Sequence, residues 1–413
     1  MAAWTEKEIK FVLDLHEKGH SRHDITEEFN EKFDSKRTAS SVKHCIETYS
    51  DYDVSKEAHI DSLKRLHSTR KAKSKVAKEN KAILDKAISQ EEFLKEFEDI
   101  IKNIKFKIHK PVKSKSKKKT NRTIFACLSD THYGADIDGE EMGDLNTYGN
   151  IEECRRTAFF TNEVAEFKAE HRKDTDLFLA LNGDLIQGVL RNLDSTTNLT
   201  TQFARAASII SQMVSYLAPK FNKIKIVSVT DNHGRRQHTS DKGRHTKNRF
   251  DSYTTMLNVT LKYAFKELKN VDFEVPVTPY WYGKIRGHNY LIMHGDTTLS
   301  VGSVGKSLNI ETIKNKINDL SSGIGPIDVV VLGHLHIPVK TLLSNGTTLL
   351  VNGSLSGIDE FCLALGIVRN SASQKIFEIT DKHSVGDMRD VDVLEADNIK
   401  ELDKIIEPFS GKF

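Results

Sequence analysis

Gly333-His334-Leu335-His336 follows the apolar run Val329–Leu332, and the fold can be inferred outward from this stretch. Three valines and a leucine in a row are typical of a strand buried inside a sheet. With 17 His and 23 Gly in the chain, a chance Gly-His-x-His has a probability of only about 0.04. Two histidines directly after a buried strand therefore indicate a chemical site at the end of that strand.

Four other apolar runs have the character of buried strands: Ile124–Leu128, Leu177–Leu181, Ile224–Val229 and Tyr290–Met293. Helical patterns lie between the runs, near residues 151–171, 203–218, 248–268 and 306–320. This alternation predicts an α/β domain built in layers. Ligand clefts in open α/β sheets lie at the carboxyl ends of strands. The residues that follow the runs are Ser129-Asp130-Thr131-His132, Asn182-Gly183-Asp184, Asp231-Asn232-His233-Gly234-Arg235 and His294-Gly295-Asp296.

In chain order these segments resemble the motifs D-x-H, G-D, G-N-H, H and G-H-x-H of calcineurin-like metallophosphoesterases, over about residues 123–380. The resemblance implies a layered β-sandwich flanked by helices and a centre of two metal ions. It implies that Asp130, His132 and His336 hold the first ion. Asn232, His294 and His334 would hold the second ion, and Asp184 would bridge the two. By the same resemblance, His233 faces the phosphate and protonates or stabilises the leaving oxygen.

The chemistry of phosphodiesters explains why such a set is needed. A phosphodiester is anionic and has a poor leaving group, and two divalent cations neutralise and align it while lowering the pKa of water. Mixed imidazole and carboxylate ligands favour Mn²⁺, with Fe or Zn as alternatives, over Mg²⁺ or Ca²⁺, which prefer oxygen ligands. The sequence therefore predicts a hydrolase with two divalent ions, Mn²⁺ first among the candidates.

Two positions depart from the family pattern. Asp231 replaces the usual glycine before Asn232, and Gly234 replaces an acidic residue that commonly follows the histidine. We expect Asp231 or Asp296 to orient His233 instead. Arg235 and Arg236 could grip substrate phosphates through their guanidinium groups. The basic loop that they begin, up to Arg249, is interpreted either as a phosphate-binding segment or as a solvated surface loop.

The first 122 residues differ in charge from the rest of the chain: they carry 29 Lys/Arg against 21 Asp/Glu. Three short capped helices are predicted in residues 1–50, with Trp4 in their core and Ile9, Val12, Leu13 and His16 on one face of the first. The order of these elements resembles Myb/SANT-type helix-turn-helix domains, whose third helix enters the DNA major groove. The contacts implied are Arg37, Ser40, Ser41, Lys43 and His44. A protein-binding three-helix module is the alternative.

Residues 51–121 are interpreted as a helical, Lys-rich linker. Lys105 to Arg122 holds nine Lys/Arg and no acidic residue, which suits non-specific attraction to phosphates, although a plain charged linker remains the alternative.

The apolar stripe Phe93–Ile104 predicts packing on the following domain or a homo-oligomer. Residues 122–385 form the predicted catalytic domain, and residues 386–413 a C-terminal tail without recognisable chemistry.

Composition excludes several classes of protein. No run of about 18 apolar residues is present, so no membrane partner is expected. The N-terminus lacks the features of a secretory signal, and Cys45, Cys127, Cys154 and Cys362 are scattered, so we expect a cytoplasmic protein with reduced thiols. The Lys-rich, proline-poor composition favours a phage or an AT-rich bacterium. If phage-encoded, the protein would work in the host cytoplasm.

The function predicted first is a metal-dependent DNA nuclease, similar to SbcD-type repair exonucleases and phage phosphoesterases. The front module and basic linker favour this hypothesis, because a small-molecule phosphatase needs neither. A phosphatase or nucleotide phosphodiesterase with a protein-binding front end is the alternative. A DNA-bound scaffold with a relict site is the third hypothesis, and the complete ligand set argues against it.

Overall fold

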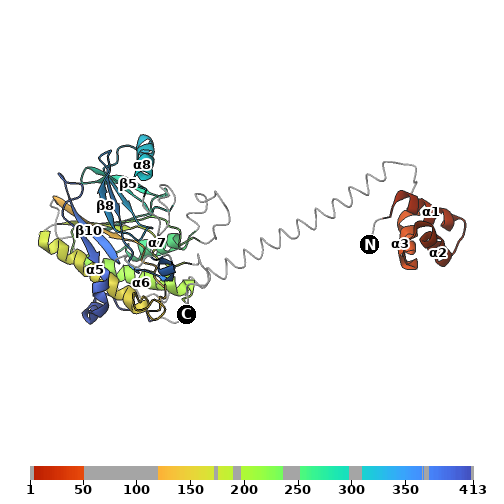
Figure 1. Cartoon of the computed structure of the whole chain (residues 1–413), viewed down its shortest axis with the longest axis horizontal. Coiled ribbons are helices and arrows are strands. Elements are labelled where there is room, and N and C mark those ends of the chain that lie inside the picture. The colour runs from red at the N-terminus through yellow and green to blue at the C-terminus, as the bar shows by residue number, and fades with distance from the viewer. Residues whose placement is uncertain are drawn as a thin grey trace. The chain divides into compact units, whose positions relative to one another are not determined.

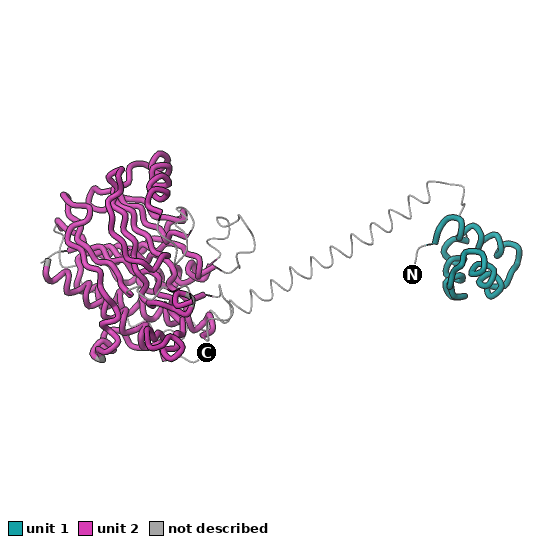
Figure 2. Tube along the Cα trace, viewed as in Figure 1, with its two compact units in different colours: residues 1–94 teal, residues 95–413 magenta. Residues whose placement is uncertain are grey.

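The computed structural model describes residues 4–50, 120–171, 175–188, 197–235, 252–296, 309–364, 366 and 372–410. The chain divides into two compact units, residues 1–94 and 95–413 (Figure 2). Three predicted features lie outside the described residues: the Lys-rich linker, the stripe Phe93–Ile104, and Arg236 with the basic loop that it begins.

The first unit holds α1 (Glu6–Glu17), α2 (Arg22–Phe33) and α3 (Ala39–Tyr49). The predicted caps are present at the first two helices, where Thr5 forms a capping box with Glu8, and Ser21 forms one with Asp24. The core lies between the three helices, with Trp4 and Phe29 rings in edge contact at 5.1 Å. The predicted inner face of the first helix was wrong at one position: His16 is exposed, and its neighbour Leu15 is buried instead.

The second unit contains a six-stranded sheet in the order β11-β10-β1-β2-β3-β4. Strands β1 to β4 are parallel, while β10 and β11 add antiparallel strands at one side. The bounds are β1 Arg122–Leu128, β2 Asp176–Leu181, β3 Ile224–Ser228, β4 Val271–Glu274, β10 Ser373–Thr380 and β11 Met388–Asp392. The parallel strands carry their carboxyl ends to one edge, which is where the first three predicted site segments begin.

A five-stranded sheet, in the order β5-β6-β7-β9-β8, lies against the first. Strands β6, β7 and β9 are parallel, and β5 and β8 form antiparallel hairpins with β6 and β9. The bounds are β5 Trp281–Ile285, β6 His288–Ile292, β7 Val329–Leu332, β8 Val339–Leu342 and β9 Thr348–Val351. The last two site segments therefore follow strands β6 and β7 of the second sheet.

Three apolar layers hold these elements together, and they confirm the predicted layered α/β sandwich. One core fills the space between the sheets, where Phe125 stacks on Phe178 and Phe377 at 5.3 and 4.6 Å. A second lies between the six-stranded sheet and helices α5, α6 and α7, and a third joins the five-stranded sheet to α8 (Figure 1). The helices are α5 Asn150–His171, α6 Leu199–Leu217, α7 Tyr253–Ala264, α8 Ile310–Ile324 and α9 Glu360–Ala364.

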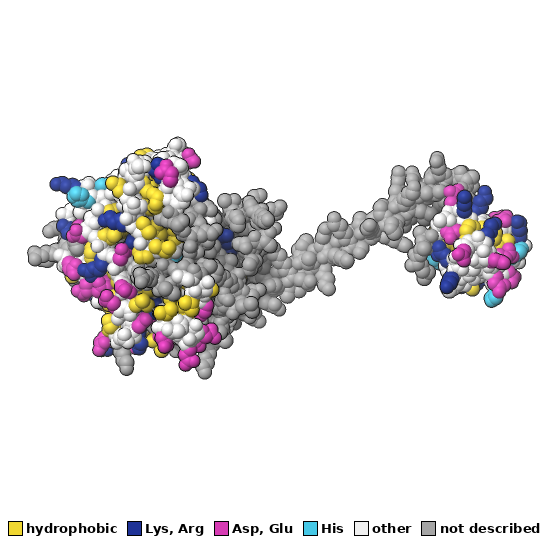
Figure 3. Space-filling view, in the orientation of Figure 1, with side chains coloured by type: hydrophobic (Ala, Val, Ile, Leu, Met, Phe, Trp, Pro, Cys, Tyr) yellow, Lys and Arg dark blue, Asp and Glu magenta, His cyan; other side chains and the backbone are white. Residues whose placement is uncertain are grey.

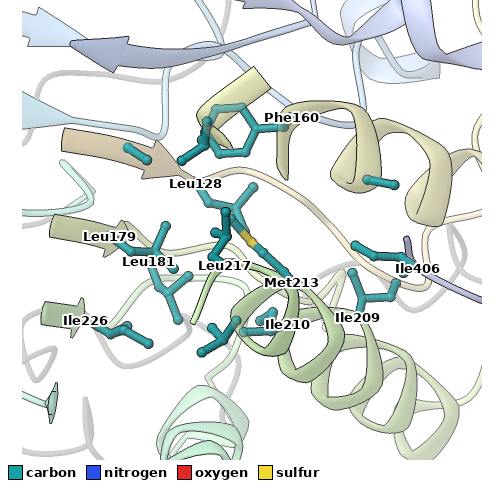
Figure 4. Close-up of a cluster of buried hydrophobic side chains, with 14 of the residues drawn as sticks. Leu128, Phe160, Leu179, Leu181, Ile209, Ile210, Met213, Leu217, Ile226 and Ile406 are labelled. Atoms are coloured by element: carbon teal, nitrogen blue, oxygen red, sulfur yellow. The ribbon is translucent and has the colours of Figure 1, made fainter. Parts of the chain in front are cut away.

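The C-terminal stretch is built into the second unit. After β11 the chain forms two short 3-10 helices, η1 (Val393–Asn398) and η2 (Lys400–Lys404). Leu402 and Ile406 are buried in the same core as α6, and Figure 4 shows Ile406 beside Ile209 of that helix. The residues predicted as a tail thus complete the helical layer over the sheet.

All four cysteines lie in described parts of the chain, where each is buried and none forms a disulfide. Among the described helices, none combines the length and the apolar character that crossing a bilayer requires.

Candidate metal centre

The predicted ligands converge where the carboxyl ends of β1, β2, β3, β6 and β7 meet. Among the described residues, three overlapping groups of side chains bring their potential ligand atoms within 4.8 Å of one another. The groups are Asp130, His132 and His336; His132, Asp184 and His233; and Asp184, His294 and His334. Six of the seven predicted ligands belong to these groups, and Asn232, the seventh, is in contact with His294 of the third group.

The first group has the spacing of ligands around one ion. Nε2 of His336 lies 3.2 Å from Nε2 of His132 and 3.4 Å from Oδ1 of Asp130. Two ligand atoms bonded to one ion at about 2.0–2.2 Å lie roughly 3.0–3.5 Å apart in octahedral or tetrahedral geometry. The Nδ1 atom of His132 is buried and has no hydrogen-bond partner among the described residues. These residues therefore fit a divalent cation held by two imidazoles and a carboxylate.

The third group, Asp184, His294 and His334, is equally close-set, and Asn232 lies beside it. Nε2 of His294 lies 2.9 Å from Oδ2 of Asp184 and 3.1 Å from Oδ1 of Asn232. The other ring nitrogen, Nδ1, contacts the Asn182 carbonyl at 2.9 Å. A carbonyl at Nδ1 fixes the ring and directs Nε2 to the centre, as is usual for histidine ligands. His334 joins this group through its ring, whose centroid is 5.1 Å from that of His294.

Asp184 is shared between groups of potential ligands. It belongs to one group with His132 and to another with His294 and His334. Its Oδ2 faces His294, while its Oδ1 accepts a hydrogen bond from the backbone N–H of His233 at 3.1 Å. A single buried carboxylate shared in this way has the placement that a bridging ligand requires.

The backbone at the centre adopts a conformation that most residues avoid. Eight non-glycine residues in the described chain have positive φ, and five of them are predicted ligands. The five are Asp130, His132, Asp184, His334 and His336, with φ from 47° to 71°. Left-handed conformations cost free energy and concentrate at functional sites, where surrounding contacts enforce them. Hydrogen bonds supply such contacts here: the N–H groups of Asp130 and His132 donate to the Gly183 and Asp184 carbonyls.

Two glycines are required by close approach to these side chains. A Cβ on Gly333 would lie 2.7 Å from a carboxylate oxygen of Asp130. Gly183 has a φ of 89°, and a Cβ there would lie 2.5 Å from Nδ1 of His294. The glycines in Gly-His-x-His and Gly-Asp are thus explained by space around the ligands.

Burial and neighbouring charges divide the histidines into two classes. Burial, followed by the repulsion of His233 and His336, lowers the pKa of His132 to about 3. Burial also lowers the pKa of His334. Burial opposes charge on His294 and His336 as well, but Asp184 and Asp130 outweigh it, and both pKa values rise to about 10. In spite of burial, neighbouring histidines, His294 first among them, hold the pKa of Asp184 well below its usual value.

His233 is placed beside the centre with one face towards solvent. Its side chain is 23% exposed, its Nε2 lies 3.9 Å from Oδ2 of Asp184, and its ring makes an edge contact with His132. Its Nδ1 contacts the Gln187 carbonyl at 2.7 Å. We expected Asp231 or Asp296 to orient this ring, and that expectation was wrong because a backbone carbonyl does so.

Asp231 and Asp296 have other contacts. The carboxylate of Asp231 accepts hydrogen bonds from the N–H groups of Asp184 and Gly234 and from the Thr254 hydroxyl. Asp231 thus holds the turn that follows β3. Asp296 forms an ion pair with Arg235, and both side chains are largely buried. Arg235 therefore ties two site loops together, in addition to any contact with substrate.

A buried polar network behind Asp130 had no clear local signal in the sequence. Ser129 donates from its hydroxyl to Asp130 at 2.6 Å, and Asn352 donates to the Ser129 hydroxyl at 2.9 Å. Gln374 of β10 bonds Ser129, Asn352 and Gly353. Gln374 follows Ser373 and precedes Lys375 at the polar start of β10, so the sequence pattern did not indicate that it is buried.

The predicted DNA contacts lie in the first unit, away from these ligands in sequence. The guanidinium of Arg37 lies over the Trp4 ring, 4.2 Å from its centroid. Lys43 and His44 are both exposed on α3, and Lys43 forms an ion pair with Glu47 at 3.6 Å. Residues 4–50 hold eight Lys/Arg and ten Asp/Glu, and Figure 3 shows both kinds on the visible face of this unit. The positive charge of the front end therefore belongs to residues 51–122.

Several solved structures resemble this chain at low sequence identity. A predicted phosphoesterase from Streptococcus pneumoniae is 13% identical over 66% of this chain and 99% of its own, with a TM-score of 0.26. A hypothetical protein from Pyrococcus horikoshii is 11% identical over 70% and 100%, with a TM-score of 0.35. Sulfate thiohydrolase SoxB from Thermus thermophilus is 10% identical over 71% and 61%, with a TM-score of 0.33.

No protein-family model matches the chain, and a comparison with curated proteins gave no match. Because the TM-scores lie below 0.5, we draw the function from the residues of the centre itself.

Proposed function

We propose that the chain is a metal-dependent phosphodiester hydrolase of the calcineurin-like type, with DNA as its substrate. One observation supports the hydrolase proposal: potential ligand atoms from five strand ends converge in three overlapping groups, which are linked through His132 and Asp184. Asp130, His132 and His336 would hold one ion, and Asn232, His294 and His334 the other. When bound, the two ions supply positive charge to the phosphate and lower the pKa of water.

The exposure of the ligands indicates where substrate enters. Asp130, Asp184 and His294 are almost fully buried, whereas Asn232, His233 and His334 are partly exposed. The phosphate would therefore approach from the side of His233. In that position the His233 ring, fixed by the Gln187 carbonyl, can hold a proton at Nε2 for the leaving oxygen.

The DNA part of the proposal is supported by the front end. Its Lys-rich segment can attract a phosphate backbone, and α3 carries Lys43 and His44 on its accessible side. The near balance of acidic and basic residues in residues 4–50 favours the second candidate, a phosphatase or nucleotide phosphodiesterase whose front module binds protein. The two candidates differ in substrate, which an assay can resolve.

The test is a comparison of substrates with Mn²⁺: plasmid, linear duplex and single-stranded DNA, next to p-nitrophenyl phosphate mono- and diesters. We expect cleavage of DNA and of the diester, both lost in an Asp184→Asn variant. Hydrolysis of the monoester alone would favour the second candidate. Absence of Mn²⁺ binding by the wild-type protein would refute the metal centre and with it the proposed hydrolase.

A further inference from the structure

The C-terminal stretch holds a buried arginine of α5. Arg156 is fully buried, and its Nε and Nη2 donate to the two carboxylate oxygens of Asp397 in η1, at 3.0 and 2.8 Å. A bidentate pair of this kind fixes both groups in orientation as well as distance. A buried guanidinium that lost its carboxylate would be left as an uncompensated charge. Asp397 therefore helps to fix the position of the Arg156 side chain.

The other donors of the same guanidinium bind two loops. Nη1 donates to the carbonyls of Leu355 and Ser356 at 3.3 and 2.8 Å. Nη2 donates to the side-chain oxygen of Asn146 and to the Thr147 carbonyl at 3.0 and 2.9 Å. Asn146 in turn donates to the Ser356 carbonyl at 2.9 Å, so the two loops are fastened to each other as well.

The loop that Arg156 holds is in direct contact with a predicted metal ligand. The N–H of Leu355 and the hydroxyl of Ser354 both donate to the backbone carbonyl of Asp130, each at 3.0 Å. Asp130 has a φ of 51°, a conformation that needs such support. A continuous set of hydrogen bonds thus runs from Asp397 through Arg156 and the 354–356 loop to Asp130.

We propose that Asp397 and Arg156 are positioning residues for the first metal ion, so that the C-terminal stretch forms part of the support of the metal centre. The proposal rests on the proposed function, because it takes Asp130 as a metal ligand. Residues that orient ligands from behind typically change metal affinity by about 10–100-fold when they are replaced. Asp397→Asn should therefore weaken one of two Mn²⁺ sites by about tenfold and leave the other unchanged.

The chain offers a matched control in the neighbouring ion pair. Asp403 of η2 pairs with Arg155 of α5 at 3.1 Å, and the pair joins α5 to the same C-terminal stretch as Asp397. Within the described part of the chain, the hydrogen bonds of the Arg155 side chain reach the Asp403 carboxylate and the Asp397 backbone carbonyl, and none reaches the 354–356 loop. Asp403→Asn in the full-length protein should loosen the same packing yet leave both Mn²⁺ affinities unchanged.

The measurement is Mn²⁺ binding by electron paramagnetic resonance of the free ion in wild type, Asp397→Asn, Asp403→Asn and Asp397→Glu, with thermal unfolding of each. The Glu variant keeps the carboxylate and should recover part of the affinity. As a kinetic counterpart, the Mn²⁺ concentration for half-maximal hydrolysis of bis-p-nitrophenyl phosphate should rise about tenfold in Asp397→Asn, while kcat at saturating Mn²⁺ should recover.

Equal Mn²⁺ affinities in Asp397→Asn and Asp403→Asn, with two sites intact in wild type, would overturn this proposal alone. If Asp397→Asn does not fold, Ser354→Ala removes one hydrogen bond to the Asp130 carbonyl without touching the ion pair. It should then show the same loss at one site, and unchanged binding would overturn the proposal. A wild-type protein that binds no Mn²⁺ would refute the proposed function and this inference together.

Discussion

Loading the metal-free protein with two divalent ions should release about two protons near pH 7.5. His294 and His336 have pKa values of about 10 in the structure, because Asp184 and Asp130 outweigh the effect of burial, and both are therefore protonated at this pH. His132, with a pKa of about 3, and His334, with a lowered pKa, are already neutral and release none. Only a deprotonated ring nitrogen can bind a metal ion.

Protons and metal ions compete for the same ring nitrogens, and this competition sets the sign of the pH dependence of metal affinity. Raising the pH removes the competing protons, so metal affinity should increase until the pH passes about 10, where both rings are neutral. With two protons displaced, the product of the two binding constants should rise about 100-fold for each pH unit. Between pH 7.5 and pH 6 the same product should fall by about 1,000-fold.

Calorimetry can count these protons. Titrating Mn²⁺ at one pH in buffers of different ionisation enthalpy gives the number released as the slope of observed heat against buffer enthalpy. His336→Ala should lower the count by about one, whereas His132→Ala should leave the proton count per bound ion pair unchanged, because the lost ring is neutral. A slope near zero in the wild type, or one that loss of His336 does not change, would refute the charge states assigned to the centre.

Three further predictions concern catalysis and DNA. His233→Ala should lower turnover by about 10²–10⁴-fold while two Mn²⁺ ions still bind; loss of an ion in calorimetry would make His233 a ligand instead. Asp184→Asn should lose metal affinity and activity together, since in the proposed centre one carboxylate serves both ions; retained stoichiometry would contradict a bridging role. Deleting residues 1–118 keeps the buried Thr120 and should preserve hydrolysis of a small diester. The salt dependence of DNA binding should become weaker, by about 0.9 in log–log slope for each phosphate that the front end neutralises. An unchanged slope in filter binding would show that the front end binds something else.

The convergence of these side chains was predictable because their sequence signals are local. Each predicted ligand follows an apolar run within a few residues, and parallel strands bring their carboxyl ends to one edge. The strands at Ile124–Leu128 and Leu177–Leu181 were recognisable for the same reason, since all but the first residue of each observed strand is buried. Residues that lie close in sequence to a buried-strand pattern could thus be assigned to the site, and residues far from such a pattern could not.

The rest could not be predicted because its partners are far apart in sequence or belong to the backbone. Arg156 and Asp397 are separated by 241 positions, and neither lies in a recognisable motif. The contact that orients His233 is made by the backbone carbonyl of Gln187, which any residue at that position would have. The sequence therefore carries no signal for it. Short strands such as β8, with its exposed and half-buried residues, carry too little apolar pattern to be recognised alone.

The left-handed ligands have a consequence for the balance between stability and activity. Five such residues, at about 1 kcal/mol each, hold roughly 5 kcal/mol of backbone strain, against a net stability of about 5–15 kcal/mol for a typical protein. The strain lies at the predicted metal ligands, and the binding of metal ions there would offset it. His334→Gly or His336→Gly, which suits a positive φ, should therefore raise the melting temperature of the metal-free protein while abolishing its metal centre. Sequences selected only for thermal stability would be expected to lose these histidines first.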